Sequence, residues 1–288
     1  MVNYKSIKLS PGLYFVSTPI GSARDITLRA LDILANADVL AAEDTRTLKK
    51  LLEIHEIPMK NRILISYHDH NGSKARPKLL AHLEQGKSIA YTSEAGTPLI
   101  ADPGFSLLTG VISAENNVTS APGPCALIAA LTVGGLPTDR FCFEGFLPNN
   151  KSQRELKFRQ LQSYRGTLIF YESAKRLKDT LVKALEIFGE TRQAVVCREI
   201  TKKFEDIKRG NLKELSSFYS DKNVKGEIVF LIAGAVDSDT DQSKIEQYVK
   251  DALRSMSVKD SAEAVALAFN VPRRDVYQIA LKIKSDGD

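Results

Sequence analysis

Five short apolar runs, separated by segments with helical periodicity, organise the first 121 residues of the chain. The runs cover residues 13–16, 39–42, 63–66, 88–92 and 117–120. Between them apolar residues recur at helical spacing, as Leu28 and Leu31 do. Strands that alternate with helices pair in parallel, because each helix carries the chain back to the edge where the next strand starts. We therefore predict an open, parallel α/β sheet.

Each apolar run leads into a loop of glycine, proline or charged residues. The longest, residues 93–104, holds two glycines and two prolines, which fix backbone dihedrals and let a ligand approach the main chain. Taken alone, this loop also fits a tight strand-to-helix turn. Because parallel strands end at one edge of a sheet, where ligands bind, five such loops predict a single ligand site. The other four loops are Ser17-Thr18-Pro19-Ile20-Gly21, Glu43-Asp44-Thr45-Arg46, His68-Asp69-His70-Asn71 and Ala121-Pro122-Gly123-Pro124.

The patterning divides the chain into three predicted parts. An α/β domain covers residues 1–121, a second α/β domain covers residues 122–236, and a linker with a helical module covers residues 237–288. In the second part we predict strands at residues 141–143, 167–171, 194–197 and 227–233, and helices at residues 125–131, 152–163 and 174–188. The loop around Pro122-Gly123-Pro124 would then lie at the hinge between the two α/β domains.

The last part has its own pattern. Residues 237–243 are Asp, Ser, Thr and Gln, a composition typical of a linker. Ser257-Val258-Lys259-Asp260 resembles a capping box, and two apolar helical faces follow on either side of a break at Asn270-Val271-Pro272. We predict a helix-turn-helix-like module; the alternative is a helical hairpin packed on the core.

Charge is unevenly distributed along a chain whose net charge is +5. Residues 151–209 hold 15 Lys and Arg against 8 Asp and Glu, whereas the remainder holds 25 against 27. A basic surface of this kind suits RNA, because neutralising phosphates dominates affinity; the alternative is a solvated helix face. In the tail only Arg273 and Arg274 are candidates for a phosphate contact.

The remaining composition points to the cytoplasm. The three cysteines, Cys125, Cys142 and Cys197, are few, odd in number and without metal-ligand spacing, which fits a reduced cytoplasmic protein. We find no secretory signal and no apolar run of the roughly 18 residues that a membrane span needs, so we expect a cytoplasmic protein without a membrane partner. His68 and His70 flank Asp69, but no further ligand completes a site, so we expect no metal.

Six motifs together resemble a known family. In chain order they are Thr18-Pro19-Ile20-Gly21, Ala42-Glu43-Asp44-Thr45-Arg46, Ala95-Gly96-Thr97-Pro98-Leu99-Ile100, Asp102-Pro103-Gly104, Pro122-Gly123-Pro124 and Arg198-Glu199-Ile200-Thr201-Lys202. From about residue 12 to the C-terminus the chain resembles the bacterial ribosomal RNA small subunit methyltransferases I, within the tetrapyrrole methylase superfamily. The resemblance implies S-adenosylmethionine bound between two α/β domains, a homodimer, and 2′-O-methylation of a cytidine in the decoding centre of 16S ribosomal RNA.

The resemblance also implies a cofactor pocket. From the first domain it would be lined by Pro19, Gly96, Thr97, Pro98, Ile100 and Asp102, and from the second by Gly123, Pro124, Cys125 and Ala126. Tyr171, at the end of a second-domain strand, fits a core position and a cofactor contact equally well. The family commonly has Ser in place of Cys125, and a thiol is a weaker hydrogen-bond partner than a hydroxyl. It commonly has Asp in place of Glu94.

Methyl transfer to a ribose hydroxyl is an in-line displacement. Alignment can supply about 7–11 kcal/mol, whereas a general base adds about 10²–10⁴-fold, so we expect positioning to dominate. We predict that Glu43 or Glu199 accepts the proton, and that Arg46 and Lys202 hold phosphates. The alternative for Arg198 and Glu199 is an interdomain ion pair.

Two other functions remain open on the residues alone. One is a corrinoid or porphyrinogen methyltransferase on the same fold, against which the basic second half and the tail argue. The other is a non-enzymatic, nucleic-acid-binding regulator, which leaves the loops of the first sheet without a purpose. The chain lacks G-x-G-x-x-G after the first strand and also G-x-x-x-x-G-K, which disfavours NAD and ATP.

Overall fold

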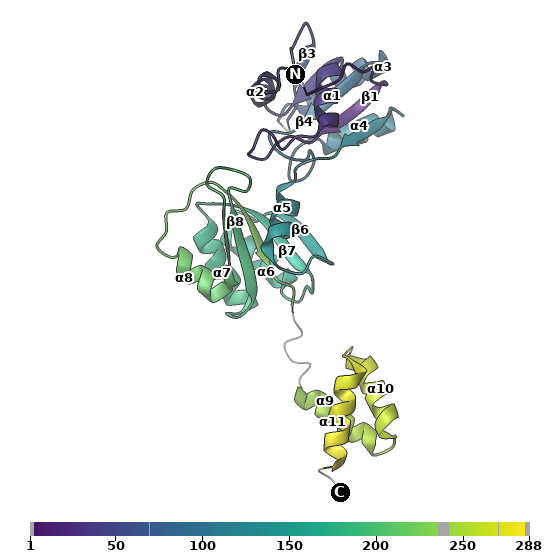
Figure 1. The fold of residues 1–288 in the computed structure, drawn as a ribbon, viewed down its shortest axis with the longest axis vertical. Helices are drawn as coiled ribbons and strands as arrows, with labels where there is room; N and C mark the ends of the chain where they lie inside the picture. The colour runs from purple at the N-terminus through teal and green to yellow at the C-terminus, as the bar shows by residue number, and fades with distance from the viewer. Residues whose placement is uncertain (1–2, 69, 236–241, 270, 286–288) are drawn as a thin grey trace. The chain divides into compact units, whose positions relative to one another are not determined.

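The computed structural model describes residues 3–68, 70–235, 242–269 and 271–285. These residues form two compact units, residues 1–234 and residues 235–288 (Figure 1). The first unit contains two five-stranded sheets and the second is helical. The predicted domain boundaries at residues 121 and 236 stay predictions.

The first sheet is open and parallel, which confirms the predicted fold class. Its strand order is β3-β2-β4-β1-β5, and every neighbouring pair is parallel. The strands start and end within one residue of the predicted runs. They are β1 (Gly12–Val16), β2 (Val39–Ala42), β3 (Ile63–Ser66), β4 (Ser88–Thr92) and β5 (Val118–Ala121).

Helices cover both faces of this sheet, which explains why its central strands are apolar throughout. Leu40 and Ala42 of β2 pack in one core, whereas Val39 and Ala41 pack in another, because successive side chains of a strand point to opposite faces. The core that holds Leu40 contains α1 (Leu28–Asn36) and α2 (Thr45–Ile54). The core that holds Val39 contains α3 (Gly72–Glu84) and α4 (Phe105–Ser113).

The second sheet is mixed. Its order is β6-β7-β10-β8-β9; β6 and β7 are parallel and all other pairs are antiparallel. Its strands are β6 (Phe141–Phe146), β7 (Thr167–Ser173), β8 (Gln193–Arg198), β9 (Asp206–Asn211) and β10 (Glu227–Ile232). Sequence patterning missed β9, because this edge strand is charged and only partly buried and so lacks an apolar run.

One helix packs on one face of the second sheet and three pack on the other. α5 (Ala126–Gly134) buries Leu127 and Leu131 against β7, β8 and β10. The larger core, on the opposite face, contains α6 (Lys151–Leu161), α7 (Leu177–Phe188) and α8 (Leu212–Tyr219). The sheet is thus covered on both faces, and the face with α5 is the one that faces the site described below.

The second unit is a three-helix module with its own core. α9 (Gln242–Leu253), α10 (Val258–Phe269) and α11 (Arg273–Ser285) pack around Val249, Val265 and Val276. Asp260 N–H donates to Ser257 Oγ at 3.2 Å, so Ser257 caps α10 as expected. Much of the predicted linker (residues 237–241) and Asn270 of the predicted break lie outside the described residues, whereas Gln242 and Ser243 belong to α9. Within the described part of the chain, no helix has the length and apolar character that crossing a membrane requires.

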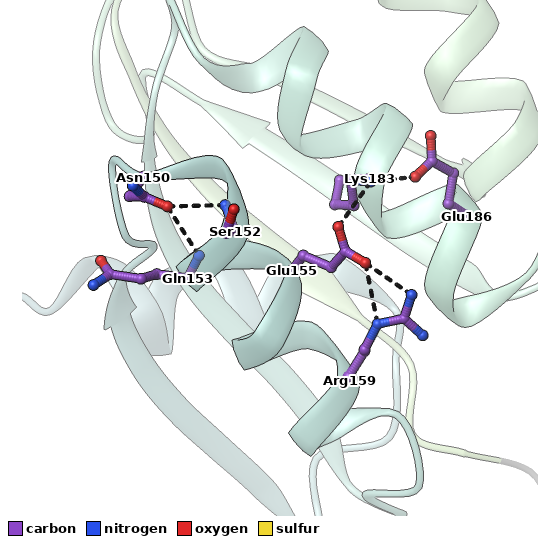
Figure 2. Close-up of polar contacts among 7 residues, drawn as sticks. All are labelled: Asn150, Ser152, Gln153, Glu155, Arg159, Lys183 and Glu186. Carbon is purple, nitrogen blue, oxygen red and sulfur yellow. Dashed lines mark hydrogen bonds and ion pairs between the residues drawn. The ribbon is translucent and has the colours of Figure 1, made fainter.

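Polar contacts fix the start of α6 and link it to α7 (Figure 2). Asn150 Oδ1 accepts hydrogen bonds from the N–H groups of Ser152 at 2.9 Å and Gln153 at 3.2 Å, which satisfies two of the helix's free donors. Glu155 pairs with Arg159 at 2.8 Å and with Lys183 of α7 at 3.2 Å. These ion pairs are partly exposed, so each contributes little.

We predict that Asn150→Ala lowers the free energy of unfolding by about 1 kcal/mol, because two N–H groups lose their acceptor. Urea unfolding followed by circular dichroism measures the change. Asn150→Asp retains the acceptor and is expected to match the wild type, and Gln153→Ala in the same turn serves as the control. Equal stability of Asn150→Ala and Gln153→Ala would contradict the capping role.

Candidate functional site

A cavity of about 420 Å³ lies in the first unit where loops of the first sheet meet the second sheet. The first sheet contributes the loops after β1 and β4. The second contributes the start of α5 and residues at or near the ends of β6, β7, β8 and β10. The lining residues are Ile20, Glu94, Ala95, Gly96, Thr97, Ile100, Asp102, Cys125, Ala126, Phe146, Tyr171, Glu172, Ser173, Cys197, Ile200, Lys202, Gly226, Glu227, Ile228 and Val229.

Hydrogen bonds join the loops of the first sheet at this cavity. Thr18 N–H donates to Gly96 O at 2.9 Å, and Gly96 N–H donates to Thr18 O at 3.0 Å. Thr97 Oγ1 donates to Pro124 O at 2.9 Å and accepts from Ser17 Oγ at 3.1 Å. The loops meet because β1 lies between β4 and β5, and all three strands end at the same edge. Backbone and side-chain hydrogen bonds therefore hold the loops after β1, β4 and β5 together on this side of the cavity.

Backbone strain gathers in two loops beside the cavity. Leu99 and Ala101 have φ of 74° and 61°, and Glu199 and Thr201 have φ of 53° and 64°. These are four of the seven non-glycine residues with positive φ in the described part of the chain. Each such residue costs on the order of 1–3 kcal/mol, and such residues cluster at functional sites. The strain therefore lies in residues 93–104 and 198–202, the two loops that line the cavity after β4 and β8.

The loop after β8 also touches the first sheet. Ser22 N–H donates to Thr201 Oγ1 at 3.3 Å, and a Cβ added to Gly21 would lie 2.5 Å from the same oxygen. Gly21 is therefore needed for close approach. Lys202, from this loop, lines the cavity.

The four predicted catalytic residues are not gathered around the cavity. Lys202 lines it, and its Nζ lies 3.0 Å from Glu199 Oε1 and 2.6 Å from Glu227 Oε2. Burial lowers the pKa of Lys202, but its hydrogen bonds to Glu227 and Glu199 outweigh burial and raise the pKa overall. Glu199 thus pairs with Lys202 of its own loop, whereas Arg198 donates to Lys225 O at 3.5 Å.

Glu199 is held as an anion. The hydrogen bond from the Glu227 N–H to its carboxylate lowers the pKa of Glu199, burial opposes this, and Lys202 adds to the lowering. A carboxylate with a lowered pKa is a weaker proton acceptor. Glu43 accepts a hydrogen bond from the N–H of Glu94 at 3.2 Å and does not line the cavity.

Arg46 has a local partner. Its guanidinium lies 2.7 Å from Asp44, which caps α2, and 90% of its side chain is exposed. The hydrogen bond from the Arg46 side chain holds the pKa of Asp44 at about 2. Arg46 lies outside the cavity lining, so its phosphate-binding role stays a prediction.

The predicted cofactor residues fall into three groups. Seven of them line the cavity: Gly96, Thr97, Ile100, Asp102, Cys125, Ala126 and Tyr171. Pro98, Gly123 and Pro124 belong to the same loops but not to its lining, and Pro19 lines a smaller neighbouring pocket. Their binding roles stay predictions.

Sequence reasoning found Tyr171 and Lys202 but missed the rest of the second sheet's contribution to the lining. Phe146, Cys197, Ile200 and residues 226–229 line the cavity. Phe146 could have been predicted as a lining residue from the sequence, because it is an aromatic residue at a strand end. Its ring lies 5.5 Å from that of Tyr171. Burial raises the pKa of the Cys197 thiol to about 12, so it stays protonated. Burial, followed by the neighbouring Cys125, raises the pKa of Tyr171.

The His68 and His70 rings lie 6.0 Å apart, and Asp69 lies outside the described residues. Among the residues that the structure describes, no group of three His, Cys, Asp or Glu is arranged to hold a metal ion.

The chain belongs to the tetrapyrrole methylase family. The family model described as Tetrapyrrole (Corrin/Porphyrin) Methylases matches residues 12–216, and the one described as RsmI C-terminal HTH domain matches residues 239–284. The fold is also similar to that of uroporphyrin-III C-methyltransferase from Thermus thermophilus in complex with S-adenyl homocysteine. That likeness has a TM-score of 0.54 and 17% identity, and covers 77% of this chain and 97% of the other.

Within this family the chain belongs to the ribosomal RNA small subunit methyltransferase I group. It is 40% identical to the Mesorhizobium japonicum protein of that name over 97% of this chain and 96% of the relative. It is 39% identical to the Rickettsia prowazekii protein over 96% and 98%. The predicted family and the helix-turn-helix module are thereby confirmed.

Asp102 lines the cavity and has a raised pKa. Burial raises its pKa to about 6, the nearby Glu43 and Glu94 add to the rise, and a hydrogen bond from Ser93 opposes it. The folded-state pKa thus lies above the ordinary value of 3.8. Between these values the unfolded chain releases a proton that the folded chain retains, so stability falls as pH rises from about 4 to about 6.

We predict that Asp102→Asn gains stability relative to the wild type over this pH window. The difference in unfolding midpoint is measured without ligand from pH 4 to pH 7.5. It should grow as pH rises and level off above about 6. The exposed Asp221→Asn serves as a control, and a difference independent of pH would contradict the shift.

Proposed function

We propose that this protein transfers a methyl group from S-adenosylmethionine to the 2′-hydroxyl of a cytidine in the decoding centre of 16S ribosomal RNA. The observation that carries the proposal is the cavity between the joined loops of the first sheet and the second sheet, in a chain of the ribosomal RNA small subunit methyltransferase I group. Such a substrate places the protein in the cytoplasm.

The residues at the cavity fit this cofactor. A volume of about 420 Å³ lies within the range of roughly 300–1,000 Å³ typical of small-molecule sites. From the first sheet, Asp102 and Glu94 contribute carboxylates that suit a cation, and Ile20, Ile100 and Val229 give apolar surface for an aromatic base. S-adenosylmethionine carries a positively charged sulfonium whose methyl group is electrophilic. Gly96 leaves main chain accessible beside it.

Lys202 is the lining residue best placed to orient an anionic acceptor strand. Its ammonium is fixed by two carboxylates and is itself part of the cavity wall. Since alignment can supply about 7–11 kcal/mol, holding the ribose in line with the methyl group is the larger share of the catalysis we propose. Of the two predicted proton acceptors, Glu199 is disfavoured by its lowered pKa, which leaves Glu43, a residue outside the cavity lining.

RNA contacts beyond the acceptor are expected from the basic stretch of residues 151–209 and from α11. Arg274 is exposed, and Arg273 lies 3.3 Å from Glu263. We also propose a homodimer. Phe105 and Ile112 lie two turns apart on α4 and are 70% and 58% exposed, an apolar face that a second copy would cover.

We predict that Gly96→Val weakens S-adenosylmethionine binding by about 1–3 kcal/mol, because the added side chain competes for cavity space. A Cβ at Gly96 would lie 3.2 Å from Ile20 Cγ2, and φ is +81°. Gly86→Val is the matched control, because its φ is +71° and nothing lies within 4 Å of the added Cβ. Calorimetry measures both; equal affinities would make Gly96 a turn residue only.

The activity is tested on small ribosomal subunits from cells that lack this gene. Incubation with the protein and labelled S-adenosylmethionine should add one 2′-O-methyl group, which mapping of ribose methylation locates at a cytidine of the decoding centre. Methylation of a base, or of uroporphyrinogen in place of RNA, would overturn the proposal. Binding of RNA without any methyl transfer would favour the regulator.

A further inference from the structure

A second pocket lies beside the cavity, within the first unit. It measures about 140 Å³ and is formed by the loop after β1, the helix α2 and the end of β4. Glu94 lines both the pocket and the cavity. The backbone bridge between Thr18 and Gly96 separates them, since Thr18 lines the pocket and Gly96 lines the cavity. A molecule in the pocket would therefore sit next to a molecule in the cavity.

The walls of this pocket combine apolar surface with unpartnered hydroxyls. Pro19, Leu48 and Leu51 provide the apolar part. Thr18 and Thr92 are only 4% and 1% exposed, and the Oγ1 of each finds no hydrogen-bond partner among the described residues. Buried polar atoms in native proteins nearly always have a partner, so two orphans in one pocket point to a ligand with a polar edge.

The size of the pocket limits what that ligand can be. A cavity of about 150 Å³ holds one benzene molecule. A volume of about 140 Å³ therefore matches a single six-membered ring better than a fused purine. Sequence-specific RNA recognition uses splayed-out bases whose edges are hydrogen-bonded, and a carboxylate such as that of Glu94 can accept from the amino group of cytosine.

We propose that this pocket receives the pyrimidine base of the acceptor nucleotide, so that its ribose faces the methyl donor in the adjoining cavity. The inference rests on the proposed function and names the base-recognition site for it. Lys50, exposed at the pocket and without an ion-pair partner in the described part of the chain, is available to the phosphate of the same strand.

The first test fills the pocket from its exposed side. Thr47 lines it from the solvent-exposed face of α2, so Thr47→Trp occupies the pocket without entering the core. We expect an unchanged S-adenosylmethionine affinity and a fall of about 10²-fold in methyl transfer to small subunits, because the acceptor is displaced. Lys49→Trp is the matched control: it is exposed on the same helix but outside the pocket lining, and should keep the wild-type rate.

The second test removes one hydroxyl and, separately, changes the base of the acceptor. Thr92→Val keeps the shape of the side chain and should lower kcat/KM by roughly 2- to 12-fold through one lost hydrogen bond. Subunits that carry a purine at the mapped acceptor should be poor substrates. If the wild type methylates no RNA, the proposed function fails. If it does, and both Thr47→Trp and the purine substrate react normally, the pocket inference fails and the proposed function stands.

Discussion

The insertion of β1 between β4 and β5 is the constraint on which the site depends. Because the three strands are parallel, their ends emerge side by side, and loops far apart in sequence can share hydrogen bonds. Thr18 pairs with Gly96 through two backbone hydrogen bonds, and Thr97 reaches Pro124. β2, on the other side of β4, adds the contact from Glu94 N–H to Glu43. Hydrogen bonds thus join four loops at this edge of the first sheet.

The second sheet forms the other side of the cavity. Its loop after β8 reaches back to the first sheet through Thr201, and this contact requires a glycine at position 21. The positive φ of Glu199 and Thr201 stores strain in the same loop, and Leu99 and Ala101 store it in the facing one. Strained residues therefore lie where the two sheets meet and lower the folding free energy gained there. Contacts with a ligand at this place would offset that loss.

Charge at the site follows from the same arrangement. Asp102, Glu43 and Glu94 come from neighbouring strand ends, and their proximity with burial raises the pKa of Asp102. Lys202 is the opposite case, since two carboxylates of the second sheet stabilise its charge. The cavity lining thus combines carboxylates from the loops of the first sheet with a lysine whose charge is balanced by two carboxylates.

Much of the first sheet follows from sequence alone, because strands buried on both faces are apolar throughout and their loops carry the Gly and Pro that strand-to-helix turns need. The loop that holds Gly96 and Thr97 could be assigned to a candidate ligand site for the same reason, and it lines the cavity. Sequence also determined the family, through the order of its motifs.

The tertiary structure decided the features that a sequence pattern cannot encode. β9 forms because β8 offers an edge for pairing, not because its own residues are apolar. Phe146, Cys197 and Gly226 meet Gly96 only when two sheets pack together. Glu199, a plausible base by its motif, is turned into an ion-pair partner by the folding of its own loop. The small pocket beside Thr92 likewise exists only where α2 crosses the ends of β1 and β4. Local sequence determines which segments become strands and turns, but the partners of a side chain depend on contacts between segments that lie far apart in the chain.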